Sequence, residues 1–169
     1  SSLKSVFFAC QAAARVMIPQ GGGKIVNIGS NFGEVAFNGR AAYAAAKAGV
    51  HHLSRALSLE WAKQGVRVNA IRPGFFPTEW NRKNFITAER EAAILGHTPM
   101  GRYGEPGELL GATLWLASDA SGFVTGAEVA VDGGYQLSGR WPYGSGSQHA
   151  TWLISRSVVF DGDAPMLDE

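Results

Sequence analysis

The stretch of sequence that decides the fold is KIVNIGS at residues 24–30, followed after a loop by AAYAAAKAGV at residues 41–50. The first stretch is a short apolar run that closes on Gly-Ser, which is typical of a buried strand entering a turn. The second stretch is rich in alanine. On a helix, residues four apart share one face, so Tyr43 and Lys47 lie one above the other. The pattern predicts a strand, a loop and a helix in this order.

The Tyr43/Lys47 pair is a candidate acid/base site. A fixed cation favours the ionised form of a nearby phenol, and general acid/base catalysis needs a group that exchanges protons near the working pH. Ser30 stands thirteen residues before Tyr43 and closes the strand. Its hydroxyl therefore points into the space above the carboxyl end of the strand, where open α/β sheets bind ligands. For the Tyr43/Lys47 pair taken alone, a solvated helix face is the alternative.

The composition describes one ordinary globular domain. The chain has 169 residues, 46% of them hydrophobic and 17% charged, with a formal net charge of +1. Such a chain has no overall electrostatic attraction to nucleic acid or to an anionic membrane, and no apolar run approaches the ~20 residues of a membrane span. The single Cys10 cannot form an internal disulfide, which indicates a reducing compartment. We expect a cytoplasmic protein with a small-molecule partner, no nucleic acid and no membrane.

Periodicity and turn signals outline the remaining elements. An apolar stripe at helical spacing ends before Pro19, and residues 66–71 form a second strand that Pro-Gly terminates. Residues 79–102 are polar and irregular. A third helix begins near residue 105 and continues to residue 116, and residues 126–131 form the last strand.

Residues 1 to about 136 resemble the second half of a short-chain dehydrogenase/reductase. The resemblance is carried by LKSVF at 3–7, by the strand and helix above, by VNAIRPG at 68–74 and by VDGG at 131–134. It implies a partial Rossmann-like, doubly wound parallel sheet that lacks its N-terminal nucleotide-binding strands. It also implies an NAD(P)-dependent oxidoreductase that interconverts an alcohol and a carbonyl by hydride transfer. Nucleotide-sugar epimerases share Tyr-x-x-x-Lys but usually carry a large C-terminal substrate domain.

In this family a serine, a tyrosine and a lysine are the catalytic set. The resemblance implies that Ser30 hydrogen-bonds the substrate oxygen and that Tyr43 exchanges a proton with it. Lys47 would bind the nicotinamide ribose and favour the ionised phenol. Tyr43 and Lys47 are therefore also cofactor-binding residues.

The loop after residue 72 is implied to contact the nicotinamide and the substrate. In the family, the backbone at Pro73 and Gly74 lies against the nicotinamide, and a threonine at the spacing of Thr78 contacts its carboxamide or the phosphates. Phe75 and Phe76 would form the wall beside the ring. Loop aromatics of this kind are more often packing residues than recognition residues.

The segment 79–102 covers the substrate in relatives, and its basic residues include Arg82 and Arg90. Guanidinium groups bind carboxylates in a bidentate manner, so the segment is a candidate site for an anionic substrate. It looks like the sugar-acid branch of the family, of the fructuronate or mannonate oxidoreductase kind. A solvated lid helix in which Glu89 and Glu91 offset the arginines is an equally good interpretation.

The resemblance does not supply the adenosine side of the cofactor site. The Gly-rich turn for the pyrophosphate and the residue that distinguishes NAD from NADP fall before residue 1 in the family, and the glycines at 21–23 precede a strand rather than follow one. We therefore expect the chain alone to contact only the nicotinamide end and to be nearly inactive. Ser2 stands where the family usually has an asparagine. A truncated, non-catalytic fragment or an interaction module is the alternative function.

Small residues at 44–46 and Gly49 would allow another helix to approach, and in the family this helix pairs with its counterpart in a second subunit. We expect a homo-oligomer, either a dimer or a tetramer. His51 and His52 diverge by about 100° on a helix and cannot share a metal ion, so no metal site is predicted. Residues 137–169 are interpreted as an atypical tail, loop-rich or partly disordered, with one short strand within 151–160 and an unstructured acidic end at 161–169.

Overall fold

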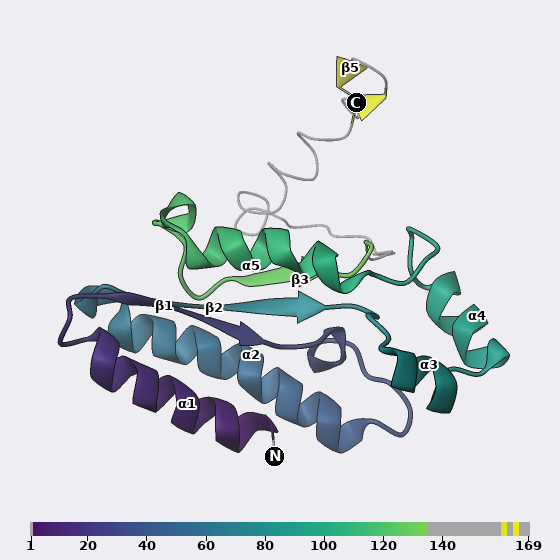
Figure 1. Cartoon of the computed structure of the whole chain (residues 1–169), viewed down its shortest axis with the longest axis horizontal. Helices are drawn as coiled ribbons and strands as arrows, with labels where there is room; N and C mark the ends of the chain where they lie inside the picture. Colours follow the sequence, from purple (N-terminus) through teal and green to yellow (C-terminus); the bar gives the residue numbers. More distant parts are fainter. Residues whose placement is uncertain (1, 135–159, 162–163, 166–169) are drawn as a thin grey trace, which may run out of the picture. The chain divides into compact units, whose positions relative to one another are not determined.

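Three parallel strands flanked by helices form the main part of the molecule (Figure 1). The computed structural model describes residues 2–134, 160–161 and 164–165. Its main helices and strands are α1 (Ser2–Met17), β1 (Gly23–Ile28), α2 (Ala41–Trp61), β2 (Val66–Pro73), α3 (Glu79–Asn84), α4 (Ala88–Gly96), α5 (Leu110–Ala117) and β3 (Glu128–Val131). Short 3₁₀ turns occur at Asn31–Gly33, Ala62–Gln64, Pro106–Leu109 and Asp119–Ser121. The chain divides into two units, Ser1–Gln136 and Leu137–Glu169.

The sheet has the order β1-β2-β3, and both strand pairs are parallel. Helices α1 and α2 cover one face and α5 lies on the other (Figure 1). Because β2 is covered on both faces, most of its residues are buried. Its fully buried apolar residues are Val66, Val68, Ala70 and Ile71, and they alternate in part with polar Arg67 and Asn69. The predicted fold class, a partial doubly wound α/β sheet, is confirmed.

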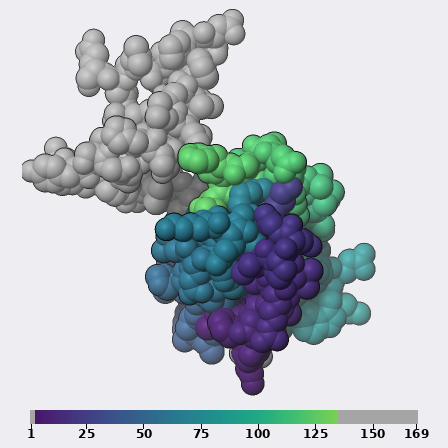
Figure 2. Space-filling model, turned by 90° about the vertical axis from the view of Figure 1, so that its left-hand side faces the viewer, coloured from purple at the N-terminus to yellow at the C-terminus, as the bar shows by residue number. Residues whose placement is uncertain are grey.

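The face predicted for α2 is the one that packs on the sheet. Leu57 joins the buried cluster with Cys10 of α1 and Val68 of β2, and Trp61 packs against it. Figure 2 shows α1, in purple, beside α2, in blue. A Cβ atom added at Gly49 would lie 2.8 Å from the side chain of Leu3. The small residue at 49 therefore admits α1 of the same chain.

A buried polar network fixes α1, β1 and α2 relative to one another. The Asn27 Nδ2 donates to Ser54 Oγ at 2.9 Å, and the Cys10 thiol donates to Asn27 Oδ1 at 3.4 Å. Ser54 in turn donates to the carbonyl of Val50 at 2.8 Å. Burial raises the pKa of the Cys10 thiol. Because buried polar groups need partners, this network specifies how the two helices sit on the sheet.

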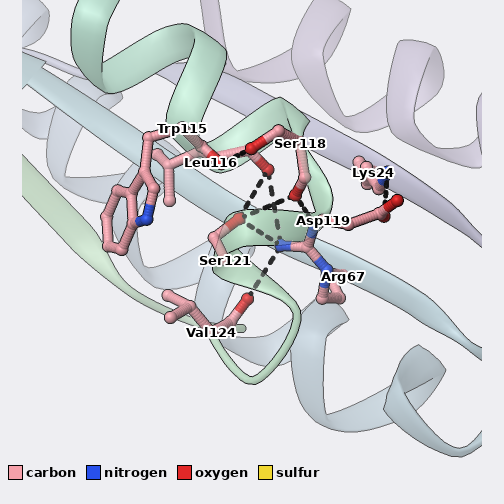
Figure 3. Close-up of polar contacts among 8 residues, drawn as sticks. All are labelled: Lys24, Arg67, Trp115, Leu116, Ser118, Asp119, Ser121 and Val124. Atoms are coloured by element: carbon pink, nitrogen blue, oxygen red, sulfur yellow. Dashed lines mark hydrogen bonds and ion pairs between the residues drawn. The ribbon is translucent and has the colours of Figure 1, made fainter.

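Arg67 of β2 clamps the C-terminal end of α5 (Figure 3). Its Nη1 donates to the carbonyls of Leu116 and Val124 at 3.3 and 3.2 Å and to Ser121 Oγ at 3.0 Å. Its Nη2 donates to the carbonyl of Ser118 at 2.9 Å. A guanidinium group suits this place because the last carbonyls of a helix lack intrahelical partners and carry partial negative charge.

The second unit contains two strands within its described residues: β4 (Phe160–Asp161) pairs antiparallel with β5 (Ala164–Pro165). The prediction that residues 161–169 lack structure is therefore wrong at Asp161 and at Ala164–Pro165. The two residues between these strands in the sequence, 162–163, are Gly-Asp, a hairpin signal that the sequence interpretation missed. The strand predicted within 151–160 lies outside the described residues except for Phe160. Among the helices that the structure describes, none is long and apolar enough to cross a membrane.

Candidate active site

The carboxyl ends of the three strands meet at one edge of the sheet, and polar contacts join the loops that leave them. Asn31, just after β1, donates from Nδ2 to Asp132 Oδ2, just after β3, at 3.2 Å. Arg72 at the end of β2 forms an ion pair with Glu34 in the loop after β1. Helices α3 and α4 lie beyond this edge (Figure 1). The loops that carry the predicted site residues are thus held together.

Ser30 lies where the sequence predicted, at the turn that follows β1. Its Oγ accepts a hydrogen bond from the Phe32 N–H at 3.2 Å, and its own backbone N–H donates to His51 Nε2 at 3.2 Å. A hydroxyl that accepts one hydrogen bond keeps its O–H as a donor. The Ser30 side chain is therefore oriented by the turn and can still donate to a ligand oxygen.

Tyr43 and Lys47 lie on one face of the first two turns of α2, as the four-residue spacing predicts. The Lys47 Nζ is 5.8 Å from the centre of the Tyr43 ring and donates to the carbonyl of Ile28 at 2.7 Å. Partial burial lowers the pKa of the Lys47 ammonium group. The Tyr43 side chain is 43% exposed. The pair therefore presents an accessible phenol beside a cation that is anchored to the end of β1.

Phe32 lies in the turn that carries Ser30 and contacts aromatic rings of α2 and of the loop after β2. Its ring centre lies 6.1 Å from that of Tyr43 and 5.6 Å from that of Phe75, both edge to face, and 5.2 Å from that of Phe37. Edge-to-face pairs of this kind stabilise by about 0.5–1.5 kcal/mol beyond the area that they bury. The sequence analysis did not identify Phe32, although it stands only two residues after Ser30.

The loop after β2 approaches β3 closely. The Gly74 N–H donates to the carbonyl of Val131 at 2.9 Å, and a Cβ atom at Gly74 would lie 2.7 Å from the Cα of Asp132. Only glycine fits there. Thr78 is the N-cap of α3, and its hydroxyl accepts from the Asn81 N–H at 3.2 Å. The predicted nicotinamide contact of Thr78 would have to come from the remaining O–H donor.

A cavity of about 460 Å³ opens beside this loop, with Phe75, Phe76 and Asp132 among its lining residues. The side chain of Phe76 leaves no room for a Cβ at Gly104. Ser30, Tyr43 and Lys47 do not line this cavity. Phe75 is shared, because its ring also contacts Phe32, and it therefore stands between the predicted catalytic residues and the cavity.

The arginines of the segment 79–102 differ in the contacts that they make. Arg102 forms two hydrogen bonds with Glu108, at 2.8 and 2.7 Å, and this arginine lowers the pKa of the Glu108 carboxyl to about 2. Arg90 donates to a backbone carbonyl at 3.0 Å. The Arg82 guanidinium lies 5.1 Å from the centre of the Tyr103 ring. A guanidinium stacked on a ring keeps its N–H edge available, so Arg82 is the best placed of these arginines for an anionic ligand.

His51 was not predicted to belong to the site, yet it contacts Ser30 directly. Its side chain is buried while His52 is exposed, so the two histidines do diverge as the helix geometry requires. His51 Nδ1 lies 3.5 Å from Glu128 Oε2. Burial is the main cause that lowers the pKa of His51. Within residues 2–134 and the two short tail strands, no cluster of side chains could hold a metal ion.

A comparison with known protein families settles the class. The family model described as enoyl-(acyl carrier protein) reductase matches residues 1–136. The chain belongs to the short-chain dehydrogenase/reductase family. Among curated short-chain dehydrogenase/reductase relatives, galactitol 2-dehydrogenase (L-tagatose-forming) of Cereibacter sphaeroides is 47% identical over 138 residues, which are 80% of this chain and 54% of that protein. The 2-dehydro-3-deoxy-D-gluconate 5-dehydrogenase of Escherichia coli K12 is 44% identical and covers 79% and 53%.

Solved structures of the same family agree with the fold. A gluconate 5-dehydrogenase from Burkholderia cenocepacia J2315, in complex with NADP and tartrate, is 44% identical and matches with a TM-score of 0.76. The match covers 79% of this chain and 52% of that one. The chain thus spans about half the length of the short-chain dehydrogenase/reductase relatives that it matches.

The described side chains fit the nicotinamide end of the cofactor that this family uses. An ammonium group has three N–H donors, and at Lys47 one of them is taken by the carbonyl of Ile28. The other two suit a pair of ribose hydroxyls. The Oδ1 atom of Asn31 is buried at the same edge without a hydrogen-bond partner, so this edge also offers an acceptor.

Proposed function

We propose that this chain carries the catalytic half of an NAD(P)-dependent oxidoreductase that interconverts an alcohol and a carbonyl, with a sugar acid as substrate. The observation that carries the proposal is the Tyr43/Lys47 pair on α2, which Phe32 joins to the Ser30 turn. The relatives named for gluconate and a gluconate derivative support the sugar-acid class, and the relative named for galactitol supports oxidation of a polyol hydroxyl.

The residues divide the chemistry as follows in the direction of alcohol oxidation. Ser30 donates its O–H to the substrate oxygen and fixes it, and the Tyr43 phenolate takes the proton from the substrate hydroxyl. Lys47 stabilises the phenolate by its charge and holds the ribose hydroxyls with its free N–H donors. A nicotinamide held by Lys47 and the loop after β2 would supply the hydride acceptor for alcohol oxidation and the hydride donor for the reverse direction.

We assign the surrounding residues by the same logic. The Pro73-Gly74 backbone lies against the nicotinamide, and Thr78 donates its hydroxyl to the cofactor. Phe75 and Phe76 form the apolar wall of the substrate space, and the cavity beside them accommodates the chain of a polyol. Arg82 binds the carboxylate of a sugar acid through the N–H donors at the edge of its guanidinium plane, which stacking on Tyr103 leaves available.

We also propose that the protein forms a homo-oligomer, a dimer or a tetramer, in the cytoplasm. The outer surface of α1 and α2 supports this proposal, because Phe7, Phe8 and Leu59 are 40%, 52% and 82% exposed. Exposed large apolar side chains on two helices that pack together are candidates for an interaction surface. A reducing compartment agrees with the single buried thiol of Cys10.

The test is a chimera in which the N-terminal half of the Cereibacter galactitol 2-dehydrogenase precedes this chain. It is assayed with gluconate and with galactitol, each with NAD⁺ and NADP⁺. We expect Tyr43→Phe to lower kcat by about 10²- to 10⁴-fold, because only the transferable proton is removed. The matched control is Tyr103→Phe, which keeps kcat within about 3-fold because Tyr103 is placed in no proton-transfer step.

Circular dichroism and thermal melting verify that each variant is folded. A Tyr43→Phe chimera that keeps most of its kcat contradicts the assigned acid/base role. A folded chimera that oxidises galactitol and not gluconate contradicts the sugar-acid assignment and leaves the acid/base role intact.

A further inference from the structure

His51 is packed beneath the turn that carries Ser30. A Cβ atom at Gly29 would lie 2.1 Å from His51 Nε2, and one at Gly33 would lie 2.5 Å from its Cε1. Neither glycine has a positive φ, so the missing side chains are explained by space and not by backbone conformation. Both ends of the turn are therefore shaped around the imidazole ring.

The hydrogen bond between Ser30 and His51 determines the tautomer of the ring. The Ser30 backbone N–H is a donor, so Nε2 must accept and cannot carry a proton. In a neutral imidazole the proton then resides on Nδ1, which faces Glu128 Oε2 at 3.5 Å. The geometry therefore describes one neutral tautomer, which connects the turn to a carboxylate.

Glu128 is itself held by a second contact. It begins β3, its side chain is 12% exposed, and its Oε1 forms an ion pair with the Arg55 Nη2 at 2.6 Å. Arg55 lies four residues after His51 on α2, so both side chains reach the same carboxylate. The chain of contacts runs from Arg55 through Glu128 and His51 to Ser30 and spans α2, β3 and the turn after β1.

We propose that His51 is a positioning residue for catalysis: its Nε2 fixes the Ser30 backbone, and Glu128 with Arg55 keeps the ring in the accepting tautomer. The proposal rests on the role of Ser30 in the proposed function. Ser30 and its neighbours must present the hydroxyl at a defined point, and a misplacement of about 1 Å can cost 10²-fold in rate. His51 supplies a hydrogen bond that no apolar residue of equal size can replace.

The first experiment separates the hydrogen bond from the volume of the ring. His51→Gln places an amide oxygen near the position of Nε2 and can still accept from the Ser30 N–H, whereas His51→Leu fills space without an acceptor. In the chimera described above, we expect His51→Leu to lower kcat by about 10- to 100-fold with KM changed less than about 3-fold. His51→Gln recovers most of that loss. His52→Leu is the matched control on the exposed neighbour.

The second experiment uses the 169-residue chain and needs no turnover. ¹⁵N shifts of the imidazole of His51 should report a protonated Nδ1 and an unprotonated Nε2. Hydrogen exchange at the Ser30 amide should accelerate by about 3- to 10-fold in His51→Leu, the value of one net hydrogen bond, and return toward wild type in His51→Gln.

The third experiment is a pH profile. Glu128 raises the pKa of His51, whereas burial, Arg55 and Lys47 lower it, and the net direction is downward from its ordinary value of about 6.5. A folded-state pKa below the unfolded value contributes stability above pH ~6.5 and loses it as the pH falls through the folded pKa. Protonation places an N–H against the Ser30 N–H, so kcat of the chimera should fall at acid pH. The part of the acid limb that His51 causes should be absent in His51→Gln and present in His52→Leu.

The outcomes distinguish this inference from the proposed function. If Tyr43→Phe abolishes turnover while His51→Leu and His51→Gln lose kcat equally, the ring acts by packing alone and the positioning role is wrong. A protonated Nε2 in the ¹⁵N spectrum, or an acid limb in His51→Gln that is identical to that of the unsubstituted chimera, also overturns it.

Discussion

Gly29 and Gly33 are the residues at which the turn after β1 makes room for a side chain from α2. At Gly29 the nearest obstacle to a Cβ is the Nε2 of His51, at 2.1 Å, which is far inside van der Waals contact. The ring is buried and hydrogen-bonded, so it has no free space to move into. A single methyl group at position 29 must therefore displace either the turn or the imidazole.

We predict that Gly29→Ala lowers the free energy of unfolding by about 1–3 kcal/mol, the usual cost of overpacking. Gly111 in the first turn of α5 is the control, because a Cβ there meets no atom within 4 Å. Gly111→Ala should leave stability unchanged or raise it by up to about 1 kcal/mol, since alanine is the better helix former. Urea unfolding of the 169-residue chain measures both. Equal stabilities of the two variants would mean that the contact at Gly29 relaxes without cost.

Residues whose relation is local could be placed from the sequence. Tyr43 and Lys47 share a face because the period of one helix fixes it, and Ser30 follows β1 because the apolar run ends there. His51 and Glu128 could not be paired in this way. They meet only because β3 is laid beside β2, a consequence of tertiary structure that no spacing along the chain encodes. The adjacency of His51 and His52 excluded a shared metal ion, but it did not indicate that His51 contacts Glu128.

At the scale of elements, α5 is held to the sheet by charge as well as by apolar contact. The Arg67 guanidinium makes four hydrogen bonds to the end of α5 and the loop that follows (Figure 3). Nearby, Lys24 forms an ion pair with Asp119 at 2.6 Å, but these side chains are 33% and 98% exposed. Both contacts join the sheet to the end of α5 and the turn after it, but the Arg67 contacts are partly buried and the Lys24–Asp119 pair is at the surface.

We predict that Arg67→Met lowers the free energy of unfolding by about 2–4 kcal/mol, because it removes four hydrogen bonds made by a charged donor. Lys24→Met, the control, should cost no more than about 1 kcal/mol, as exposed ion pairs contribute little. Chemical denaturation at low and at high salt separates them, since only the Lys24 effect should shrink at high salt. A loss at Arg67 no larger than that at Lys24 contradicts the clamp.

Two helices in the segment 79–102 were not predicted from the sequence. Residues 79–102 were interpreted as polar and irregular, with a lid helix as the alternative, and the structure has the two short helices α3 and α4 there. Thr78 and Thr87 cap them by accepting from the backbone N–H three residues later. Threonine before a polar run is an N-terminal helix signal. Short amphipathic helices carry too few turns for periodicity alone to reveal them.

At the scale of the molecule, the parallel sheet was implied by the family resemblance, and the structure confirms it. In a parallel sheet the carboxyl ends of the strands lie at one edge, and the candidate active site is at this edge. Under the proposed function, Tyr43, Lys47 and the loop after β2 contact only the nicotinamide end of a dinucleotide there. The printed sequence contains no Gly-x-Gly-x-x-Gly turn, the feature with which this class of sheet binds a pyrophosphate.

We therefore predict that the 169-residue polypeptide, without a partner half, binds NADH and NADPH with Kd weaker than about 1 mM. Much of the affinity for a dinucleotide comes from its pyrophosphate at a helix N-terminus, whereas Lys47 supplies one cation and two free donors. Calorimetric titration of the chain with each cofactor measures this Kd directly. The chimera with a relative's N-terminal half is the positive control. We expect it to bind at least 10-fold more tightly, because it restores the pyrophosphate site. Saturable micromolar binding by the chain alone contradicts the prediction. Lys47→Met would then show whether the cofactor binds at the carboxyl ends of the strands, since binding there must weaken when the ammonium group is lost.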